Sequence, residues 1–342
     1  MRQRRKLHRH LEGSIRLETL AAIAREFRLP LPGYDVADIR PLVQVVEDDP
    51  PDAPTYLSKF GVLREFYRSP QVIDRIAYEA VADAAAEHIV YFELRFTPPA
   101  LARARGYSLA EVTDWVIAAT RRAAYDFGVE TRLILSMNRH ESVELGHQVV
   151  EVAADRLDEG VVAVDLAGAE HDHPGEEFEP VFAAAREAGL RVTIHAGEWA
   201  GPESIRMAVE RLGASRIGHG VRVVEDSDVL QMARERGIVF EVCPTSNVQS
   251  GVVRGYDQHP LRDMYQVGLA TTLNTDNTGV GGFGLADEYV RAVTHLGLGE
   301  KDVQQMVLNA ARAAFLPARE RDRLARRVAR ALGLSEGVPS AS

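Results

Sequence analysis

The chain has 342 residues, of which 46% are hydrophobic, and this is enough for a large buried core. Its 50 acidic and 40 basic residues give a net charge of −10, which argues against a dedicated nucleic-acid or anionic-membrane binder. The single cysteine, Cys243, excludes an intrachain disulfide and any site with four cysteine ligands. No run approaches the roughly 20 apolar residues of a membrane span, and the N-terminus lacks an apolar signal segment, so we expect a cytoplasmic protein.

Short apolar segments alternate with amphipathic helical segments along most of the chain, and their period and length separate strands from helices. The segments predicted to be strands are 6–8, 90–96, 132–136, 161–166, 191–195, 216–219, 238–243 and 269–274. The segments predicted to be helices are 17–27, 71–87, 109–127, 142–156, 180–188, 202–212, 226–236, 260–266, 287–295, 301–315 and 317–332.

Eight strands separated by helices predict a (β/α)8 barrel with extra helices after the last strand. A doubly wound open sheet is the alternative, but no G-x-G-x-x-G sequence follows the first strand. The length allows two domains. No linker divides the sequence, however, so we expect one barrel domain over residues 1–342, with a frayed tail at 335–342.

Residues 31–70 do not fit a simple strand–helix unit. This segment contains an acidic, proline-rich stretch at 47–54 and a short amphipathic helix at 56–66. We expect an insertion after the first strand that forms a lid over one mouth of the barrel, because long insertions in compact domains often cover active sites. Alternatively, the segment is a surface insertion that is unrelated to function.

Side chains that can bind metals or carry protons follow several of the predicted strands. His8 and His10 are two residues apart, so on an extended chain both imidazoles point to the same side. His195 ends another strand, and Glu198 follows it beyond a glycine turn. Taken separately, each of these patterns is also compatible with a structural histidine or a solvated glutamate.

Two further groups follow later strands. His219 lies between two glycines, and Asp276 and Asn277 follow the eighth strand. Either group could be a simple turn on its own. The carboxyl ends of the strands of a barrel converge on one face, however, so we expect all these side chains to lie close together. Together they indicate one functional site more strongly than any of them does alone. The predicted metal ligands are His8, His10, His195 and Asp276, a set that suits zinc or a neighbouring divalent ion.

The lysine content helps to choose between one metal and two. Related dinuclear barrels commonly bridge their metals with a carbamylated lysine at a strand end. The only lysines here are Lys6, Lys59 and Lys301, and none of them ends a later strand. We therefore expect one metal ion per chain rather than two.

The motifs resemble those of the adenosine deaminase family in order and in placement on successive strands. They are HRHLEGSIR at 8–16, FELRFTP at 92–98, VDLAGAE at 164–170, HAGEWAGPES at 195–204, RIGHGVR at 216–222, CPTSNVQ at 243–249 and LNTDN at 273–277. The likeness extends from Lys6 to about Phe315. It implies a single-zinc barrel that hydrolytically removes ammonia from a 6-aminopurine, with a purine nucleoside or base as its small-molecule partner.

The resemblance also implies roles for individual residues. Glu198 corresponds to the group that protonates purine N1, His219 to the group that orients the attacking hydroxide, and Asp276 to a ligand that also takes part in catalysis. The substrate-binding positions are His10, Glu12, Gly168, whose N–H would meet N3, and Asn277, which would donate to N7.

Two departures from the family pattern affect the expected substrate. Glu12 stands where many nucleoside-specific members have Asp, and adenine-specific relatives tend to carry Glu there. Asn277 replaces a common Asp, and an amide can donate to N7 without first being protonated. We expect adenosine and 2′-deoxyadenosine as substrates. The alternatives are adenine or aminodeoxyfutalosine and, more remotely, a purine-binding protein without activity.

Overall fold

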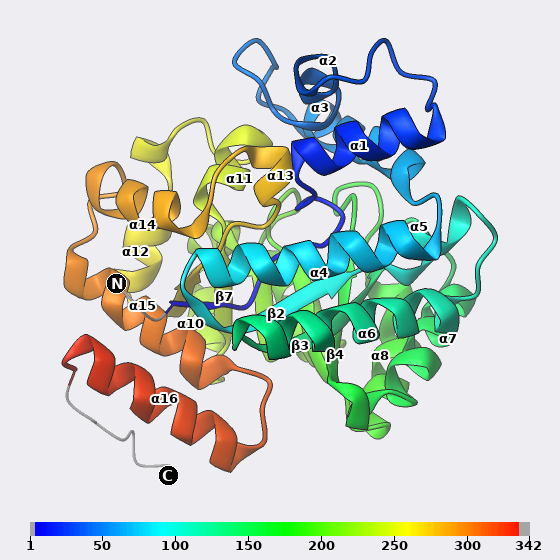
Figure 1. The fold of residues 1–342 in the computed structure, drawn as a ribbon. Coiled ribbons are helices and arrows are strands. Elements are labelled where there is room, and N and C mark those ends of the chain that lie inside the picture. The colour runs from blue at the N-terminus through cyan, green and yellow to red at the C-terminus, as the bar shows by residue number, and fades with distance from the viewer. Residues whose placement is uncertain (1–3, 335–342) are drawn as a thin grey trace.

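The structure is a computed structural model that describes residues 4–334, and the expected tail at 335–342 lies outside these residues. Eight parallel strands pair in chain order and roll into a nearly closed barrel surrounded by helices (Figure 1). This confirms the (β/α)8 prediction, because a doubly wound sheet would reverse its strand order. The strands are β1 (Arg4–Lys6), β2 (Ile89–Phe96), β3 (Glu130–Asn138), β4 (Val161–Ala167), β5 (Arg191–Ala196), β6 (Arg216–His219), β7 (Val239–Val242) and β8 (Ala270–Leu273).

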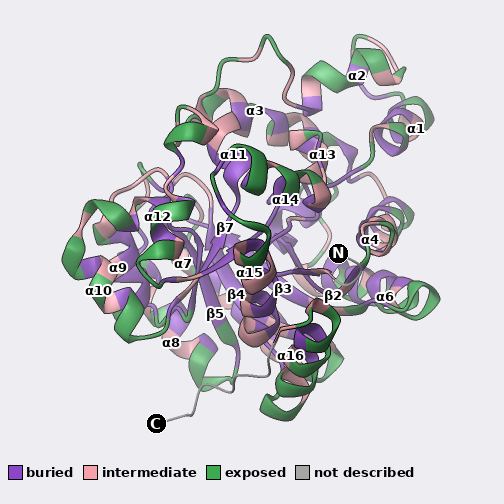
Figure 2. Ribbon diagram, turned by 90° about the vertical axis from the view of Figure 1, so that its left-hand side faces the viewer, coloured by how far each residue is buried: buried purple, intermediate pink, exposed green. Residues whose placement is uncertain are grey.

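Amphipathic helices form the outer layer, with their apolar sides against the strands and their polar sides in solvent (Figure 2). Those between the strands are α4 (Pro70–Ala86), α6 (Leu109–Phe127), α7 (Val143–Ala154), α8 (Glu179–Glu187), α9 (Pro202–Glu210), α10 (Ser227–Glu235) and α12 (Leu261–Gln266). Those after β8 are α13 (Thr278–Gly281), α14 (Leu285–Thr294), α15 (Glu300–Ala313) and α16 (Ala318–Leu332). Helix α15 packs against β8 and β1, and α16 packs on α15.

Local sequence signals explain where these helices begin and end. Ser108 and Glu111 form a reciprocal capping box at the start of α6, and Gly128 takes the left-handed conformation at its end, with φ 67°. Pro202 occupies the first turn of α9, as the sequence predicts. The helix ends at Glu210, two residues earlier than expected.

The segment 31–70 forms helices that lie above the barrel (Figure 1). It contains α2 (Val36–Val43), α3 (Ala53–Leu63) and the 3₁₀ turn η1 (Arg64–Phe66), and it follows α1 (Leu17–Phe27). The predicted helix at 56–66 is therefore α3 and η1, whereas α2 was not anticipated. Short helices also follow two strands, as α5 (Pro98–Arg103) and α11 (Pro244–Gln249), and the remaining 3₁₀ turns are η2 (Leu157–Glu159), η3 (Glu176–Phe178), η4 (Val221–Glu225) and η5 (Tyr256–Gln258).

The ring closes just beyond the paired residues of β1 and β8. Arg9 and Asp276 form a parallel bridge. The amide of His10 donates to the carbonyl of Asp276 at 3.0 Å, and the amide of Asp276 donates to the carbonyl of His8 at 3.3 Å. The backbone contacts that close the barrel therefore also fix three of the predicted ligands next to one another. Within residues 4–334, no helix combines the length and apolar character that a membrane crossing needs.

Candidate active site

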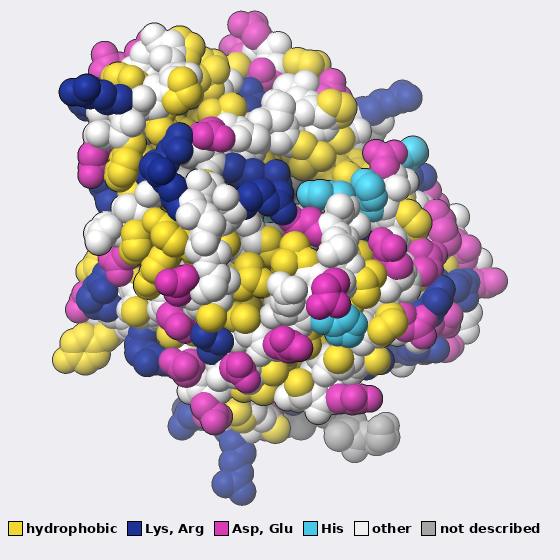
Figure 3. Space-filling model, turned by 90° about the vertical axis from the view of Figure 1, so that its right-hand side faces the viewer, with side chains coloured by type: hydrophobic (Ala, Val, Ile, Leu, Met, Phe, Trp, Pro, Cys, Tyr) yellow, Lys and Arg dark blue, Asp and Glu magenta, His cyan; other side chains and the backbone are white. Residues whose placement is uncertain are grey.

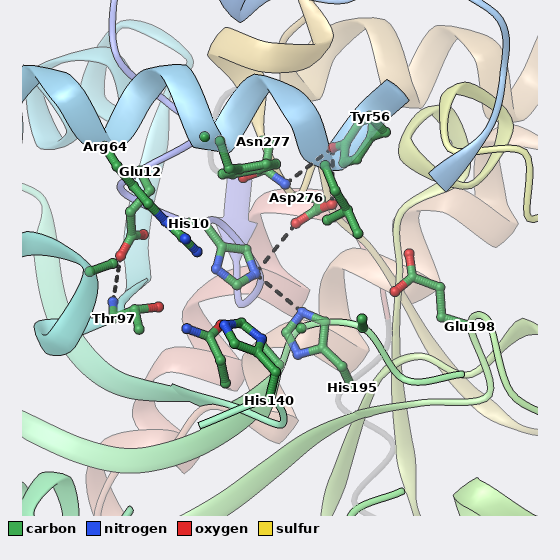
Figure 4. Close-up of a pocket in the computed structure, with 18 of the residues that line it drawn as sticks. His10, Glu12, Tyr56, Arg64, Thr97, His140, His195, Glu198, Asp276 and Asn277 are labelled. Carbon is green, nitrogen blue, oxygen red and sulfur yellow. Dashed lines mark hydrogen bonds and ion pairs between the residues drawn. The ribbon is translucent and has the colours of Figure 1, made fainter. Parts of the chain in front are cut away.

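A cavity of about 330 Å³ opens at the carboxyl ends of the strands, beneath α3. Its size falls in the range of small-molecule sites. Strand ends and the loops after them supply His10, His195, His219 and Asp276 to its wall, and α3 supplies Tyr56 (Figure 4). The 31–70 segment therefore covers the cavity that the sequence predicts as the active site.

The four predicted metal ligands converge in this cavity. One side-chain ligand atom from each of the residues lies within 4.8 Å of all the others. Oδ1 of Asp276 lies 3.4 Å from Nε2 of both His8 and His10, and Nε2 of His10 lies 3.2 Å from Nε2 of His195. These residues come from the ends of β1, β5 and β8, which the barrel brings together although they are far apart in the sequence.

The atoms of this cluster fit a divalent ion. Nε2 of His8 is buried and has no hydrogen-bond partner among the described residues, although an orphaned buried nitrogen is costly. Imidazole nitrogens and carboxylate oxygens are both zinc ligands, and a zinc ion held by four such groups can expand to five-coordinate and take up water or substrate. A cation would satisfy the His8 nitrogen and balance the Asp276 carboxylate.

Buried carboxylates orient two of the imidazoles from behind. Glu241 lies 3.0 Å from Nδ1 of His8, and Asp165 lies 3.0 Å from Nδ1 of His195. Hydrogen bonds of this kind fix which ring nitrogen faces a metal. Arg95 pairs with both carboxylates, at 2.6 Å from Glu241 and 3.3 Å from Asp165, so that neither charge is buried alone.

Neighbouring hydroxyls hold the carboxylate of Asp276. Ser246 and Tyr56 donate to its Oδ2 atom, at 2.7 and 3.3 Å. This leaves Oδ1 directed at the histidines. Burial opposes ionisation of Asp276, but His8 and His10 hold its pKa well below the ordinary value. The backbone of Asp276 is left-handed, with φ 59°, a conformation that is unusual for a residue other than glycine and concentrates at functional sites.

Glu198 is buried on the other side of the cavity from Glu12 (Figure 4). Burial raises its pKa well above the ordinary value, and the nearby charges of Asp276 and Glu170 act in the same direction. Glu170 also anchors the loop, because its carboxylate accepts four consecutive amide hydrogens from residues 197–200, at 2.6–3.0 Å. The fold therefore places a carboxyl group whose environment favours the protonated form at a fixed point in the cavity.

His219 lies between Glu198 and the metal-ligand cluster. Its Nδ1 atom accepts a hydrogen bond from Nδ2 of Asn247 at 3.0 Å and lies 3.5 Å from Oε1 of Glu198. Burial lowers its pKa well below the ordinary value, so the ring is neutral. It shares with Asp276 a left-handed backbone, with φ 61°. The acceptor role at Nδ1 puts the ring hydrogen on Nε2.

The remaining predicted residues also line the cavity. Gly168 contributes backbone only, in a left-handed conformation with φ 93°. Asn277 donates from Nδ2 to the Tyr56 hydroxyl at 3.1 Å, which leaves its second amide hydrogen free. Glu12 accepts from the backbone amide of Thr97 through Oε1, while its Oε2 is buried without a partner among the described residues.

Several residues of the site were not singled out from the sequence. Tyr56 belongs to the insertion, and nothing in its local pattern indicates a contact with Asp276, 220 positions away. Ser246 and Asn247 lie in the CPTSNVQ motif, and Asp165 and Glu170 lie in VDLAGAE. Both motifs resemble those of the family and both contain a strand end. A polar residue in such a motif is therefore the sequence signal that could have indicated these supporting contacts.

The fold and this cluster define a metal-dependent hydrolase barrel of the amidohydrolase type. A family model described as Adenosine deaminase matches residues 4–331, and the chain belongs to that family. It is 39% identical over 325 residues to an adenosine deaminase of Klebsiella pneumoniae, a match that covers 95% of this chain and 97% of the relative. The protein is therefore a hydrolytic deaminase that acts on C–N bonds.

Solved structures of relatives share the whole architecture. An adenine deaminase from Arthrobacter aurescens superposes with a TM-score of 0.87 at 27% identity, covering 96% of this chain and 99% of that one. A zinc-bound amidohydrolase from Burkholderia ambifaria gives a TM-score of 0.88 at 28% identity, covering 97% and 90%. The family resemblance recognised in the motifs is thus confirmed over nearly the whole chain.

Proposed function

We propose that this chain catalyses the zinc-dependent hydrolysis of adenosine and 2′-deoxyadenosine to inosine and 2′-deoxyinosine, with release of ammonia. The observation that carries the proposal is the convergence of His8, His10, His195 and Asp276 beside the buried acid Glu198. The identity to curated adenosine deaminases supports the nucleoside as substrate.

We assign the zinc ion to the four converging side chains, because their donor set and the orphaned Nε2 atom of His8 fit it. The zinc-bound relative supports the same ion here. When bound, zinc supplies the Lewis acidity that makes water a nucleophile near neutral pH. Asp165 and Glu241 keep the rings of His195 and His8 in the orientation that ligation requires.

In this proposal Glu198 carries the proton that makes the purine ring electrophilic. Attack at C6 places electrons on N1, so an acid must supply a proton there. The raised pKa favours the protonated form of Glu198, and the Glu170 carboxylate, which accepts the backbone amides of the loop, fixes the loop that carries Glu198. His219 and Asp276 border the same space: the Nε2–H group of His219 orients the attacking water, and the Asp276 carboxylate accepts its proton.

The rest of the cavity positions the substrate. We propose that the Gly168 amide donates to N3 and that the free amide hydrogen of Asn277 donates to N7. His10 lies beside the ring, and Glu12 reaches the ribose, since its unpaired Oε2 can accept a hydroxyl hydrogen. We further propose that residues 31–70 act as a lid, because Tyr56 and its neighbours on α3 line the cavity from above.

Free adenine is the second candidate substrate, because Glu12 is longer than the Asp common in nucleoside-specific members. Its carboxylate lies within the cavity and could fill part of the volume that ribose would need. The structural likeness to the Arthrobacter adenine deaminase supports the same reading.

The test is a comparison of kcat/KM for adenosine, 2′-deoxyadenosine, adenine and aminodeoxyfutalosine with the purified zinc enzyme. The proposal predicts that the two nucleosides are the best substrates and yield the 6-oxopurine and ammonia. A higher kcat/KM for adenine would replace the proposal by the second candidate. Failure to deaminate any of the four compounds would refute the site assignment itself.

A further inference from the structure

A buried histidine outside the cavity has no role in the reaction described above. His259 lies between η5 and α12 and is only 6% exposed. Histidines at the surface, some of which are visible in Figure 3, can exchange hydrogen bonds with water at either ring nitrogen. A ring as buried as that of His259 depends on partners within the protein. Burial lowers its pKa to about 3, so the ring is neutral and carries one hydrogen.

The backbone decides which nitrogen of His259 carries this hydrogen. The amide nitrogen of Leu261 lies 3.1 Å from Nδ1 of His259. A backbone amide can only donate, so Nδ1 accepts and the ring hydrogen is on Nε2. Leu261 is the first residue of α12, and Pro260 before it has no N–H group. The bond therefore also satisfies the first amide of the helix, which has no partner within the helix itself.

The hydrogen on Nε2 of His259 in turn fixes the orientation of Asn247, on α11. Nε2 lies 3.3 Å from Oδ1 of Asn247 and donates to it. An asparagine amide without such a partner could flip and exchange its oxygen and nitrogen. Here a flip would place the Asn247 amino group against the N–H group of His259, so that two donors would face each other. Nδ2 of Asn247 is therefore the atom that faces Nδ1 of His219, at 3.0 Å.

His219 is the last member of this series of hydrogen bonds. Because Asn247 donates to its Nδ1 atom, the ring hydrogen of His219 lies on Nε2. Asn247 and His219 are both buried, which keeps bulk water from replacing either partner. The direction of each bond thus follows from one backbone amide, that of Leu261. The last N–H group of the series belongs to a ring that lines the cavity.

We propose that His259 is a positioning residue for the deamination, because through Asn247 it holds His219 in the tautomer whose Nε2–H group orients the attacking water. This inference rests on the proposed function, since it takes that water as the partner of His219. The opposite tautomer would present a lone pair to the cavity. A lone pair cannot donate to the oxygen that attacks C6, and a donor aimed at developing negative charge is what lowers the barrier.

The test compares the wild-type zinc enzyme with three variants. His259→Phe keeps a ring but removes both nitrogens, and His259→Gln keeps an N–H donor near the place of Nε2. Asn247→Asp exchanges the amide donor for a carboxylate, which accepts a hydrogen from Nδ1 of His219 and so favours the opposite tautomer. The matched control is His147→Phe, because His147 lies on α7 and does not line the cavity.

The first readout is the tautomer of His219 itself. Nitrogen NMR spectra of protein that carries isotope-labelled histidine show which ring nitrogen is protonated, and His219→Gln identifies the signals of this ring. In the wild type and in His147→Phe, Nε2 should carry the hydrogen. In Asn247→Asp the hydrogen should move to Nδ1, and in His259→Phe both tautomers should be populated, because the Asn247 amide is then free to flip.

The second readout is the kinetics with adenosine. In His259→Phe, kcat should fall roughly 10- to 100-fold, the range typical for loss of a hydrogen bond that orients a site histidine. KM should change little, because the lost interaction acts on the attacking water and not on substrate binding. His259→Gln should recover most of the loss, and Asn247→Asp should lose at least as much as His259→Phe. His147→Phe should keep the wild-type kcat.

Protonation of Nδ1 of His219 in the wild type would overturn the inference, as would a wild-type kcat in His259→Phe. If His259→Phe does not fold, Asn247→Asp decides, and the wild-type tautomer together with the wild-type kcat in that variant is the contradicting result. If the wild type deaminates no nucleoside, the proposed function has failed instead, whereas the nitrogen spectra still test the series of hydrogen bonds.

Discussion

Replacing Glu198 by Gln isolates the proton that the site delivers to the purine. The amide has nearly the same shape as the acid and can still donate a hydrogen bond to N1, but it cannot transfer a proton. Glu198 is 5% exposed, so bulk water cannot readily replace it as the proton donor. General acid catalysis contributes about 10²- to 10⁴-fold, and turnover should fall by that factor, which equals about 3 to 5 kcal/mol in the barrier.

The assay follows ammonia release from adenosine at saturating substrate and measures zinc content in parallel. Zinc should be retained in the Glu198→Gln variant, since Glu198 is not among the four converging ligands. Glu203→Gln provides the control, because Glu203 is exposed at the start of α9, five residues further along. In the wild type, activity should fall as the pH rises through the raised pKa of Glu198, because only the protonated acid donates. Turnover near the wild-type level in Glu198→Gln would refute the assignment.

Three other substitutions test the surroundings of the site and the fold. Tyr56→Phe removes a donor to Asp276 and a partner of Asn277, so kcat/KM should fall by roughly tenfold, and an unchanged value would remove Tyr56 from the site. Asp165→Asn weakens the orientation of His195 and should lower zinc affinity about 10- to 100-fold in competition with a chelator; equal affinity would contradict this. Burial raises the pKa of Glu288 from 4.5 to about 7. The protonated side chain therefore contributes fully to the free energy of unfolding below pH 4.5, and this contribution is lost as the pH rises through 7. Between pH 5 and pH 8, the free energy of unfolding of the wild type, measured by urea titration, should therefore fall by up to about 3 kcal/mol relative to that of Glu288→Gln. The same pH dependence in both proteins would refute the burial argument.

The strands were predictable because most are short apolar runs bounded by turn residues. The prediction of a strand at 161–166, for example, differs from β4 only in lacking Ala167. The first strand was less well placed, since β1 is Arg4–Lys6 and its sequence reads as polar. Arg5 and Lys6 are nevertheless fully buried, and hydrophobic periodicity cannot anticipate buried charges.

The helix α2 was missed for a different reason. Pro41 lies within it, and an internal proline normally argues against a helix. Here the capping box of Asp35 and Asp38 begins the helix, and it continues for only two residues beyond the proline. Local caps therefore outweigh one unfavourable residue in so short an element.

Some residues of the candidate site can be predicted from local sequence patterns, whereas others join the site only through the fold. The side chains that carry the proposed chemistry follow strands, so the barrel topology alone predicts that they meet. The supporting groups, such as Tyr56 and Glu241, meet that cluster through contacts more than 200 positions apart in the sequence. No local pattern fixes such contacts.

The most direct test of the account is a zinc titration of metal-free protein with adenosine as substrate. Ammonia release should be negligible at the start, rise linearly with added zinc and level off at about one equivalent per chain. Activity in the metal-free protein, or a plateau only at two equivalents, would contradict a single zinc site formed by His8, His10, His195 and Asp276.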